Sequence, residues 1–530
     1  MTRHRTIRIA LPILAAAVFL AGALRFGADT GPVDGSRLFR QVMERVSRDA
    51  ISGQGEDNLY EQAARGLLQS IDDPYAELFS PDQLASFQRN TMRNDYAGVG
   101  MQIEAQPGRT VVSSVFPGSP AEHGGVQVGD RIVAVDDTST TGLLLSQVSA
   151  RLLGVAGTPV NVTFERPGVA EPIRMTFTRA RIHVPSVPFA LMLDDGVGYV
   201  PLPRFNNSAS AEVEAALRDL DRQGARAYVL DLRRNLGGVL EQAAEISNLF
   251  LQPGQEIVRV SYRSQPAEVH VANRPALIGS KPLVVLIDES SASASEIVAG
   301  ALQDHDRALI VGEPSYGKGV VQSMYPLDNG WALRITTAEW KTPSGRSIHR
   351  PRNREGVPVG PDSAASATEA AAEGPVYRSD AGRPIRGGGG IKPDLLIISD
   401  TMSTPEQVVA KAIAPKSQQV YAGLTDLAVD SRAGLRPDFE VTEPMRDRFA
   451  AIVRDAGIEV SAEQLAAARP LVDRWVEQQI ARTAFGDSTA FRRRIRDDGQ
   501  LKQALTLLHK GRTQAELFAL TSSNERGAVN

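Results

Sequence analysis

The sequence predicts a multidomain α/β protein, with a layered α/β core, a small β-rich module in front of it, and helical regions at both ends. Two continuous apolar runs, Ala227–Leu232 and Pro282–Ile287, have the composition of strands that are buried on both faces. Each run is followed by a loop and then by a helical pattern, over Leu240–Leu251 and Glu296–Leu302. This alternation of strand and helix is typical of a sheet covered by helices.

The composition of the 530 residues excludes several kinds of site and partner. Hydrophobic residues make up 42% and charged residues 23%, which is the balance of a globular protein. The formal net charge of −4 gives no reason to expect nucleic acid as a partner. The chain contains no cysteine, which excludes disulfides, thiolate zinc sites and a cysteine nucleophile. We expect no metal site and no cofactor.

Residues 1–30 have the pattern of an export signal. Basic side chains precede the apolar run Ile9–Leu24, and Ala21–Ala23 offers a small-residue cleavage site. The run is short for a helix that spans a bilayer. Besides a cytosolic protein in which the pattern is incidental, two main alternatives stay open, a cleaved signal peptide and an uncleaved membrane anchor. Both predict a periplasmic or extracytoplasmic protein, which in the second case is anchored in the inner membrane.

The chain changes character twice before its midpoint. Residues 37–94 show apolar side chains at helical spacing. Residues 95–183 alternate short β-branched runs with Gly and Asp, which predicts a small β module with one helix over Leu144–Leu153. Residues 184–400 carry the α/β core and include an Asp-Asn-Gly hairpin turn at 328–330.

Two further segments complete the organisation. Residues 350–390, inside the core region, are rich in Ala, Ser, Thr and Gly, so we expect a flexible insertion there. Residues 401–530 are predicted to be helical. An apolar stripe in this last region, formed by Val472, Trp475 and Val476, indicates a core or a subunit interface rather than a ligand site.

Three serines open the second core helix. Ser291, Ser293 and Ser295 follow a buried strand and precede the helical run that begins at Glu296. A serine in this position is presented at the edge of a sheet, where the N–H groups of the helix terminus can stabilise an oxyanion. A helix cap made of small residues is the alternative interpretation.

The segment Gly312–Gly319 allows two interpretations. It matches the phosphate-binding pattern G-x-x-x-x-G-K up to Lys318, but Gly319 replaces the hydroxyl residue that would hold magnesium, and a strand-like run follows in place of a helix. Alternatively, Lys318 is a base that burial holds neutral, because glycine and valine surround it and no acid is adjacent. We favour the base and keep a nucleotide-binding protein as the alternative.

A third block, Asn235–Gly238, follows the strand that ends near Asp231. Its two glycines allow the backbone to approach a substrate closely, although a plain strand-to-helix turn is the alternative. Together the three blocks resemble the carboxyl-terminal processing (tail-specific) serine peptidases. That family is marked by D-L-R-x-N-x-G-G, S-A-S-A-S-E and G-x-x-x-x-G-K-G-x-x-Q, which stand here at Asp231–Gly238, Ser291–Glu296 and Gly312–Gln322.

The resemblance, which covers residues 37–400, implies a serine-type endopeptidase and assigns roles to its residues. Ser293 is the implied nucleophile, Lys318 is the general base at the family spacing, and Gln322 orients the lysine. The remaining implied site residues are the oxyanion-hole residues, which act through their backbone N–H groups, and one auxiliary acid: Gly237, Gly238, Ala294 and Asp304.

The β module at 95–183 resembles the PDZ domain of the same family. Its segment Tyr96–Met101 matches the carboxylate-binding loop, whose successive N–H groups hold a terminal carboxylate. In many family members an arginine precedes the glycine that corresponds to Gly154, whereas this chain has Leu153 there and Arg151 two positions earlier. The residues implied to bind the carboxylate are Gly98, Val99, Gly100 and Met101.

The resulting hypothesis is an endopeptidase that recognises C-terminal tails through a PDZ domain and hydrolyses peptide bonds with a Ser–Lys dyad. Its expected partners are protein or peptide substrates with free C-termini. An adaptor or activator protein, association with a membrane, and a homo-oligomer remain open. A non-catalytic PDZ scaffold is the second alternative, and the complete set of Ser293, Lys318 and Gln322 argues against it.

Overall fold

A computed structural model describes the chain outside its extreme N-terminus and a few short gaps. Its residues divide into two compact units after Asp72. Within this part of the chain, no helix is both long and apolar enough to cross a membrane. The predicted export signal at 1–30 lies outside the described residues. The described ranges are 34–51, 55–88, 92, 95–359, 374–398 and 402–527.

The first unit contains the two helices α2 (Gly35–Asp49) and α3 (Glu56–Ser70). The side chain of Asp34 accepts the N–H groups that begin α2, which explains why the helix starts there. The helices predicted for this stretch are therefore present. Leu38, Phe39, Val42 and Val46 form an exposed apolar stripe along α2.

The second unit is built around a six-stranded sheet in the order β10-β11-β12-β15-β16-β21. Neighbouring strands pair in parallel, except that β10 pairs antiparallel with β11. The two apolar runs of the sequence form β12 and β15, at the centre of the sheet. The strands are β10 (Leu191–Leu193), β11 (Val197–Pro201), β12 (Ala227–Asp231), β15 (Leu283–Ile287), β16 (Leu309–Gly312) and β21 (Leu395–Leu396).

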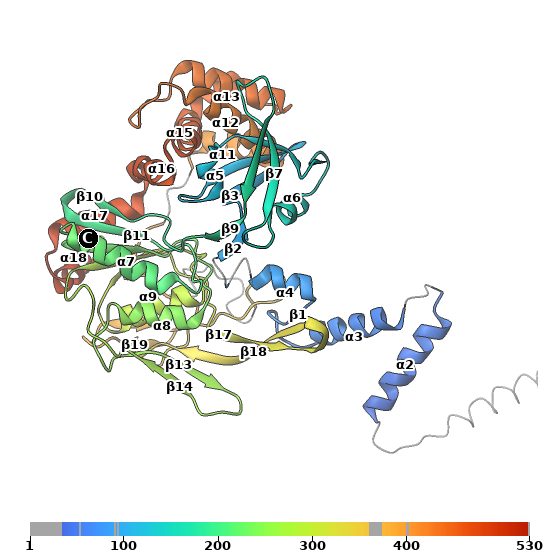
Figure 1. Ribbon diagram of the computed structural model, residues 1–530. Coiled ribbons are helices and arrows are strands. Elements are labelled where there is room, and N and C mark those ends of the chain that lie inside the picture. The colour runs from blue at the N-terminus through green and yellow to red at the C-terminus, as the bar shows by residue number, and fades with distance from the viewer. Residues whose placement is uncertain are drawn as a thin grey trace, which may run out of the picture. The chain divides into compact units, whose positions relative to one another are not determined.

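Helices cover both faces of this sheet, as the buried parallel strands require. On one face lie α7 (Ala209–Arg222), α8 (Leu240–Asn248) and α9 (Ala294–Asp304), which share a core with Val285. The alternate residue Val284 belongs to a second core on the opposite face, which the last two helices cover. These two helices are α17 (Gly499–Lys510) and α18 (Gln514–Gly527) (Figure 1).

The region 401–530 is helical, as predicted, and its helices divide between two cores. The last two helices belong to the α/β core, because Leu501, Leu508 and Leu517 pack on the second face of the sheet, beside Phe491 of α16. The preceding helices form a separate core that contains Val472 and Val476, with Trp475 packed against it. They are α11 (Thr404–Ile413), α12 (Ser417–Ser431), α13 (Glu443–Asp455), α14 (Ala462–Ala467), α15 (Arg469–Phe485) and α16 (Asp487–Arg494).

A second sheet carries the base-bearing segment. β17 (Val320–Pro326) and β18 (Ala332–Lys341) form a long antiparallel hairpin around the predicted turn at 328–330, coloured yellow in Figure 1. The other edge of β18 pairs with β1 (Glu77–Phe79) and with β13 (Glu256–Tyr262), and β13 pairs in turn with β14 (Glu268–Val271). The strand β1 corrects the expectation that 37–94 is helical throughout: Leu78 and Phe79 are buried in the sheet, and α4 (Pro81–Phe87) follows.

The first and last strands of the predicted β module pair with each other, at its expected limits. β2 (Asp95–Gly98) pairs with β9 (Ala180–His183). Between them lies a sheet in the order β3-β4-β5-β7-β8, with β6 beside β5, and one face of it packs on the predicted helix α6 (Leu145–Leu152). The other elements are β3 (Met101–Gln106), β4 (Arg109–Val115), α5 (Pro120–His123), β5 (Arg131–Val135), β6 (Thr138–Ser139), β7 (Pro159–Glu165) and β8 (Ile173–Thr178).

The expected flexible insertion at 350–390 is corrected in part. Residues 360–373 lie outside the described residues. From residue 374 onward, however, the chain forms the hairpin β19 (Val376–Arg378) and β20 (Pro384–Arg386). Charged contacts hold this hairpin on the core, because Arg383 pairs with Asp306 (2.5 Å) and Asp394 (2.6 Å). Glycine content alone does not reveal such contacts.

Candidate active site

Ser293 stands at the turn that joins β15 to α9. Its backbone has φ 52° and ψ −109°, a combination that is rare for any residue with a side chain. The hydroxyls of Ser291 and Ser295 are fully buried and donate to the carbonyls of Leu232 (2.9 Å) and Asn235 (2.9 Å). Among these three serines, Ser293 is therefore the one that the turn presents to solvent.

The carboxylate of Glu296 connects the two predicted catalytic segments. Glu296 lies in the first turn of α9 and is 1% exposed. Its Oε2 accepts the backbone N–H groups of Ser293 (2.7 Å) and Lys318 (2.9 Å). Its Oε1 accepts the Ser315 hydroxyl (2.5 Å) and the Gly317 N–H (2.7 Å). One oxygen atom thus holds the main chains of the predicted nucleophile and the predicted base beside each other.

The protonation state of Glu296 follows from its donors. Burial raises the pKa of the Glu296 carboxyl, while the hydrogen bonds from Ser315, Lys318, Gly317 and Ser293 lower it. Backbone N–H groups can only donate, so the ionised carboxylate is the form that satisfies all four partners. Sequence reasoning assigned no role to this residue, although Glu296 ends the S-A-S-A-S-E block and could have been recognised there.

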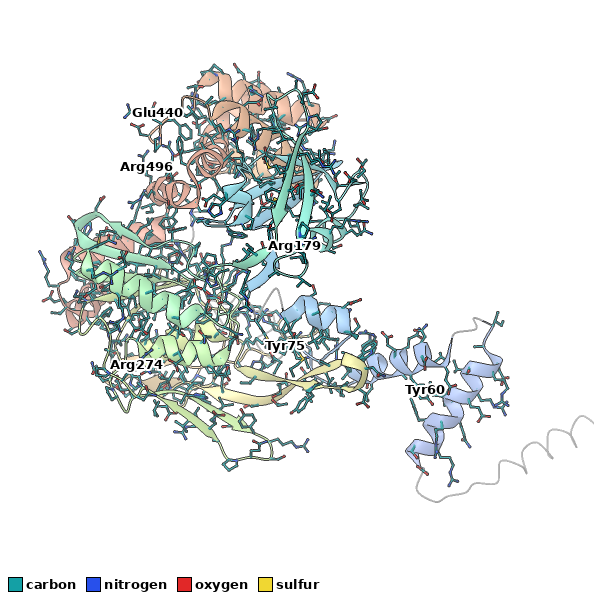
Figure 2. All side chains as sticks on the ribbon, in the orientation of Figure 1. Tyr60, Tyr75, Arg179, Arg274, Glu440 and Arg496 are labelled. Atoms are coloured by element: carbon teal, nitrogen blue, oxygen red, sulfur yellow. The ribbon has the colours of Figure 1, made fainter. Side chains whose placement is uncertain are left out.

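The Lys318 side chain lies in a mostly buried position. Its Nζ is 4.6 Å from the centre of the Tyr75 ring, which is labelled in Figure 2. Among the described residues, no carboxylate forms an ion pair with it. Burial and the Arg334 charge lower the pKa of Lys318 from 10.5 to about 8, against the opposing charges of Glu296 and Asp73. A substantial fraction of the amine is therefore neutral near physiological pH.

The residue Tyr75 is a second neighbour that sequence reasoning left without a role. Burial raises the pKa of Tyr75 to about 12, so its hydroxyl stays protonated. The hydroxyl has no hydrogen-bond partner among the described residues. The signal that could have indicated it is the segment Ile71–Tyr75, which also matches the family but lies far upstream of the three motifs in the sequence.

The predicted oxyanion residues lie around the nucleophile. A Cβ added to Gly237 would be 3.0 Å from the Ser293 Cβ and 3.0 Å from the Ala294 nitrogen, so this approach requires glycine. The N–H of Gly237 donates to the Asn235 side chain (2.9 Å) and is already used. Among the described residues, the N–H groups of Gly238 and Ala294 have no partner. These two N–H groups are therefore the better candidates for an oxyanion hole.

The hydrogen bond that the structure gives the Gln322 side chain goes to a neighbouring strand and not to Lys318. The Gln322 side-chain amide donates to the Thr336 hydroxyl (3.4 Å) on the neighbouring strand β18. Thr336 donates in turn to Asp73 (2.9 Å), one of the charges that act on Lys318. In this arrangement Gln322 belongs to a chain of polar contacts behind the lysine, and it forms no described hydrogen bond with the amine itself.

Asp304 lies at the opposite end of α9 from Ser293. At 1.5 Å per residue, the length of the helix places the two residues about 16 Å apart. The Asp304 carboxylate is 2.7 Å from a guanidinium nitrogen of Arg346 and accepts the Ser344 N–H (2.9 Å). The expectation of an auxiliary acid at the active site is therefore corrected: Asp304 is 2% exposed and forms part of a buried ion pair.

A groove of about 690 Å³ lies beside the predicted carboxylate-binding loop. Gly98, Val99 and Met101 line one side of it, and residues of α6 such as Leu145 and Leu152 line the other. The carbonyl of Gly100 accepts the Phe116 N–H (3.0 Å) and the Ser119 hydroxyl (3.0 Å), which fixes the loop. This arrangement leaves an edge strand and an apolar helix face between which a peptide can lie.

The structure contradicts the nucleotide interpretation of Gly312–Gly319. A phosphate-binding loop leads into a helix, whereas this segment leads into strand β17. The N–H groups of Gly317 and Lys318, which would have to face a phosphate, donate to the Glu296 carboxylate. A phosphate therefore cannot bind to these N–H groups, because the buried Glu296 carboxylate already accepts them. Among the described residues, no cluster of three or more His, Asp or Glu side chains could hold a metal ion.

Comparison with known proteins gives two family matches and several relatives. Residues 196–363 match peptidase family S41, and residues 111–166 match the PDZ domain. The carboxy-terminal processing protease CtpA of Bacillus subtilis is 34% identical over 323 residues, which cover 61% of this chain and 68% of that protein. The carboxy-terminal-processing protease of Bartonella bacilliformis is 36% identical over 329 residues, covering 61% and 73%.

Among solved structures, the photosystem II D1 C-terminal processing protease is similar over 63% of this chain and 93% of its own, at 30% identity and a TM-score of 0.33. The fold and the sequence matches together define a serine peptidase with a PDZ domain. The chain belongs to the carboxy-terminal processing proteases of peptidase family S41. It is accordingly a serine-type endopeptidase.

Proposed function

We propose that this peptidase cleaves its substrates with a dyad of Ser293 and Lys318 and selects them by their free C-terminal tails. The observation that carries the proposal is the shared oxygen of Glu296, which binds the backbone N–H of both residues. Because a single rigid group orients both segments, the nucleophile and the base are positioned before a substrate arrives.

The proposed reaction uses the lowered pKa of Lys318. The neutral amine accepts the proton of the Ser293 hydroxyl while Oγ bonds to the carbonyl carbon of the substrate. The N–H groups of Gly238 and Ala294 donate to the oxyanion that forms. The lysine then gives its proton to the leaving amine as the C–N bond breaks. Water hydrolyses the acyl-enzyme, again with Lys318 as the base.

Tail recognition is assigned to the PDZ groove. In this proposal a substrate adds a strand to the edge of β3 and places its α-carboxylate on the N–H groups of Val99, Gly100 and Met101. The positive φ of Gly100 (85°) matters here, because a Cβ at this position would be 2.2 Å from the Ser119 Cβ. Only glycine therefore fits at this point of the loop.

We also propose that the enzyme acts outside the cytoplasm, as a periplasmic or extracytoplasmic protein with or without an inner-membrane anchor. The support is the basic and apolar pattern of residues 1–30. Fractionation of cells that express the tagged full-length chain tests this assignment. Recovery of the mature chain from the cytosol alone contradicts it.

The dyad is tested by a double-substitution cycle on a reporter peptide. Ser293→Ala and Lys318→Met each lower kcat/KM by at least about 10⁴-fold, and the double variant loses little more, because residues of one catalytic unit are non-additive. Ser291→Ala is the matched control and retains activity of the same order as the unmodified enzyme in its folded fraction. Additive losses, or an active Ser293→Ala variant, contradict the dyad. A fully inactive natural enzyme would favour the scaffold alternative.

A further inference from the structure

Among the described residues that line the groove beside the PDZ loop, one carries an unpaired positive charge, and it belongs to the peptidase core. Among the residues that line the groove, the charged side chains are those of Asp95 and Arg204. Asp95 already pairs with Arg181 (3.0 Å). The guanidinium of Arg204 is exposed and has no partner among the described residues. Within the described lining, the free cation therefore comes from outside the PDZ domain.

The segment that precedes α7 lies beside the groove. β2 runs directly into the loop that begins at Gly98, and its partner β9 leads out of the PDZ domain toward the core. Just beyond β9, the Ser186 hydroxyl donates to the Asn206 side chain, and the Val187 N–H donates to Glu212 (2.9 Å). Asn206 lines the groove beside Arg204. Because β9 pairs antiparallel with β2, its last residue His183 lies beside Asp95. These contacts hold Arg204 on the core side of the groove that Gly98, Val99 and Met101 also line.

Arg204 also adjoins the segment that supports the nucleophile. Its neighbour Phe205 donates its N–H to the Gly237 carbonyl (3.2 Å) and accepts the Val239 N–H (2.8 Å). Gly237 in turn packs against Ser293. The chain that carries the arginine is therefore bound through its backbone to the loop that carries Gly238, one of the two candidate oxyanion N–H groups.

We propose that Arg204 binds the α-carboxylate of a substrate tail, together with the N–H groups of the PDZ loop. The inference rests on the proposed tail recognition and identifies the positively charged side chain that binds the carboxylate of the tail. A guanidinium matches a carboxylate in geometry and stays protonated at every relevant pH. The tail is then held by both the PDZ domain and the core, and its carboxylate links the PDZ groove to the segment beside Gly237.

Arg151 of α6 is the rival source of a positive charge, since it lies within the PDZ domain. Its guanidinium faces Thr138 (3.5 Å), and the residue does not line the groove. Leu153, by contrast, lines the groove and is apolar. The geometry thus favours Arg204 over Arg151 as the source of the positive charge, although Arg151 is close in sequence to residues that line the groove.

The experiment measures binding and cleavage of two peptides that differ only in a free or an amidated C-terminus. Binding is measured by fluorescence anisotropy on the full chain that carries Ser293→Ala, and cleavage on the active chain. In Arg204→Gln, the preference for the acid over the amide falls by about tenfold, the loss expected for one charge-assisted hydrogen bond at an exposed site. Affinity for the amide stays unchanged. Arg204→Lys keeps part of the preference, and the matched control Arg151→Gln keeps all of it.

Each of the other outcomes is decisive. An unchanged acid-to-amide preference in Arg204→Gln overturns the inference while leaving tail recognition intact. An equal loss for both peptides also overturns it, since Arg204 would then support the fold. A loss confined to Arg151→Gln transfers the role to the PDZ domain itself. Equal binding of acid and amide by the otherwise unmodified chain contradicts the proposed tail recognition as a whole.

Discussion

At the N-terminal end of α9, Ser293 holds a strained backbone and the nearby Lys318 is buried without a described carboxylate partner. At the C-terminal end of the same helix, the Asp304 carboxylate lies 2.7 Å from Arg346, which is fully buried. Strain and an unpaired lysine therefore lie at the N-terminal end of α9, whereas a paired carboxylate and arginine lie at its C-terminal end. Strain and an unpaired charge cost stability, and proteins retain them where function needs them.

The two buried carboxylates of α9 differ in the same way. Glu296 accepts four hydrogen bonds, and two of its donors are the backbones of the proposed dyad. Asp304 binds an arginine and a turn of the chain, far from the nucleophile. Burial alone therefore does not mark a catalytic group. What distinguishes the two carboxylates is which segments they hold.

The largest expected effect concerns the unpaired charge at the N-terminal end. Because the neutral amine is the active form and the pKa of Lys318 is about 8, kcat/KM rises with pH, about tenfold per unit below that value, and levels off above it. Lys318→Arg lowers kcat/KM by at least about 10⁴-fold at every pH, since guanidinium stays protonated. A pH–rate profile of both forms checks this. A flat profile between about pH 6 and 9 contradicts a lysine base.

Neutralising each carboxylate in turn distinguishes the roles of the two ends of α9. Glu296→Gln removes acceptors from the backbones of Ser293 and Lys318, so kcat/KM falls by about a hundredfold or more through misplacement of the dyad. Asp304→Asn leaves Arg346 buried without its counter-charge and lowers the free energy of unfolding by about 3–5 kcal/mol. The folded fraction of Asp304→Asn keeps kcat/KM within about twofold. Urea unfolding measures the free energy of unfolding. Active-site titration at low temperature gives the concentration of folded enzyme, from which kcat/KM is calculated.

The reverse pattern counts against this comparison. If Asp304→Asn inactivates enzyme that remains folded while Glu296→Gln does not, the catalytic end of α9 has been wrongly assigned.

The smallest expected effect is on the strained turn. Ser293→Gly relieves a backbone conformation that costs residues with a Cβ about 1–3 kcal/mol, so it raises the free energy of unfolding by about that amount relative to Ser293→Ala. Both variants lack the nucleophile and are inactive. Thermal unfolding of the two proteins under the same conditions makes the comparison. A glycine variant that is less stable than the alanine variant would show that the turn is not strained.

Local pattern was sufficient for much of the fold. The apolar runs that form β12 and β15, the helix α6, and the turn at 328–330 each depend on side chains within a few residues. The strand β1 was missed because three residues carry little periodic signal and its partner, β18, lies far along the chain. The hairpin β19–β20 was missed because its stability comes from ion pairs with distant residues.

The amino-acid sequence by itself determined the class of the protein and the chemical identities of its proposed nucleophile and base, because ordered motifs preserve residue types and spacing. Only the tertiary structure decided which groups meet. It directed Gln322 to Thr336, moved Asp304 to the far end of α9, and placed Glu296 between Ser293 and Lys318. The reason is physical: hydrogen bonds, burial and charge act over a few ångströms in space, whichever residues the fold brings together.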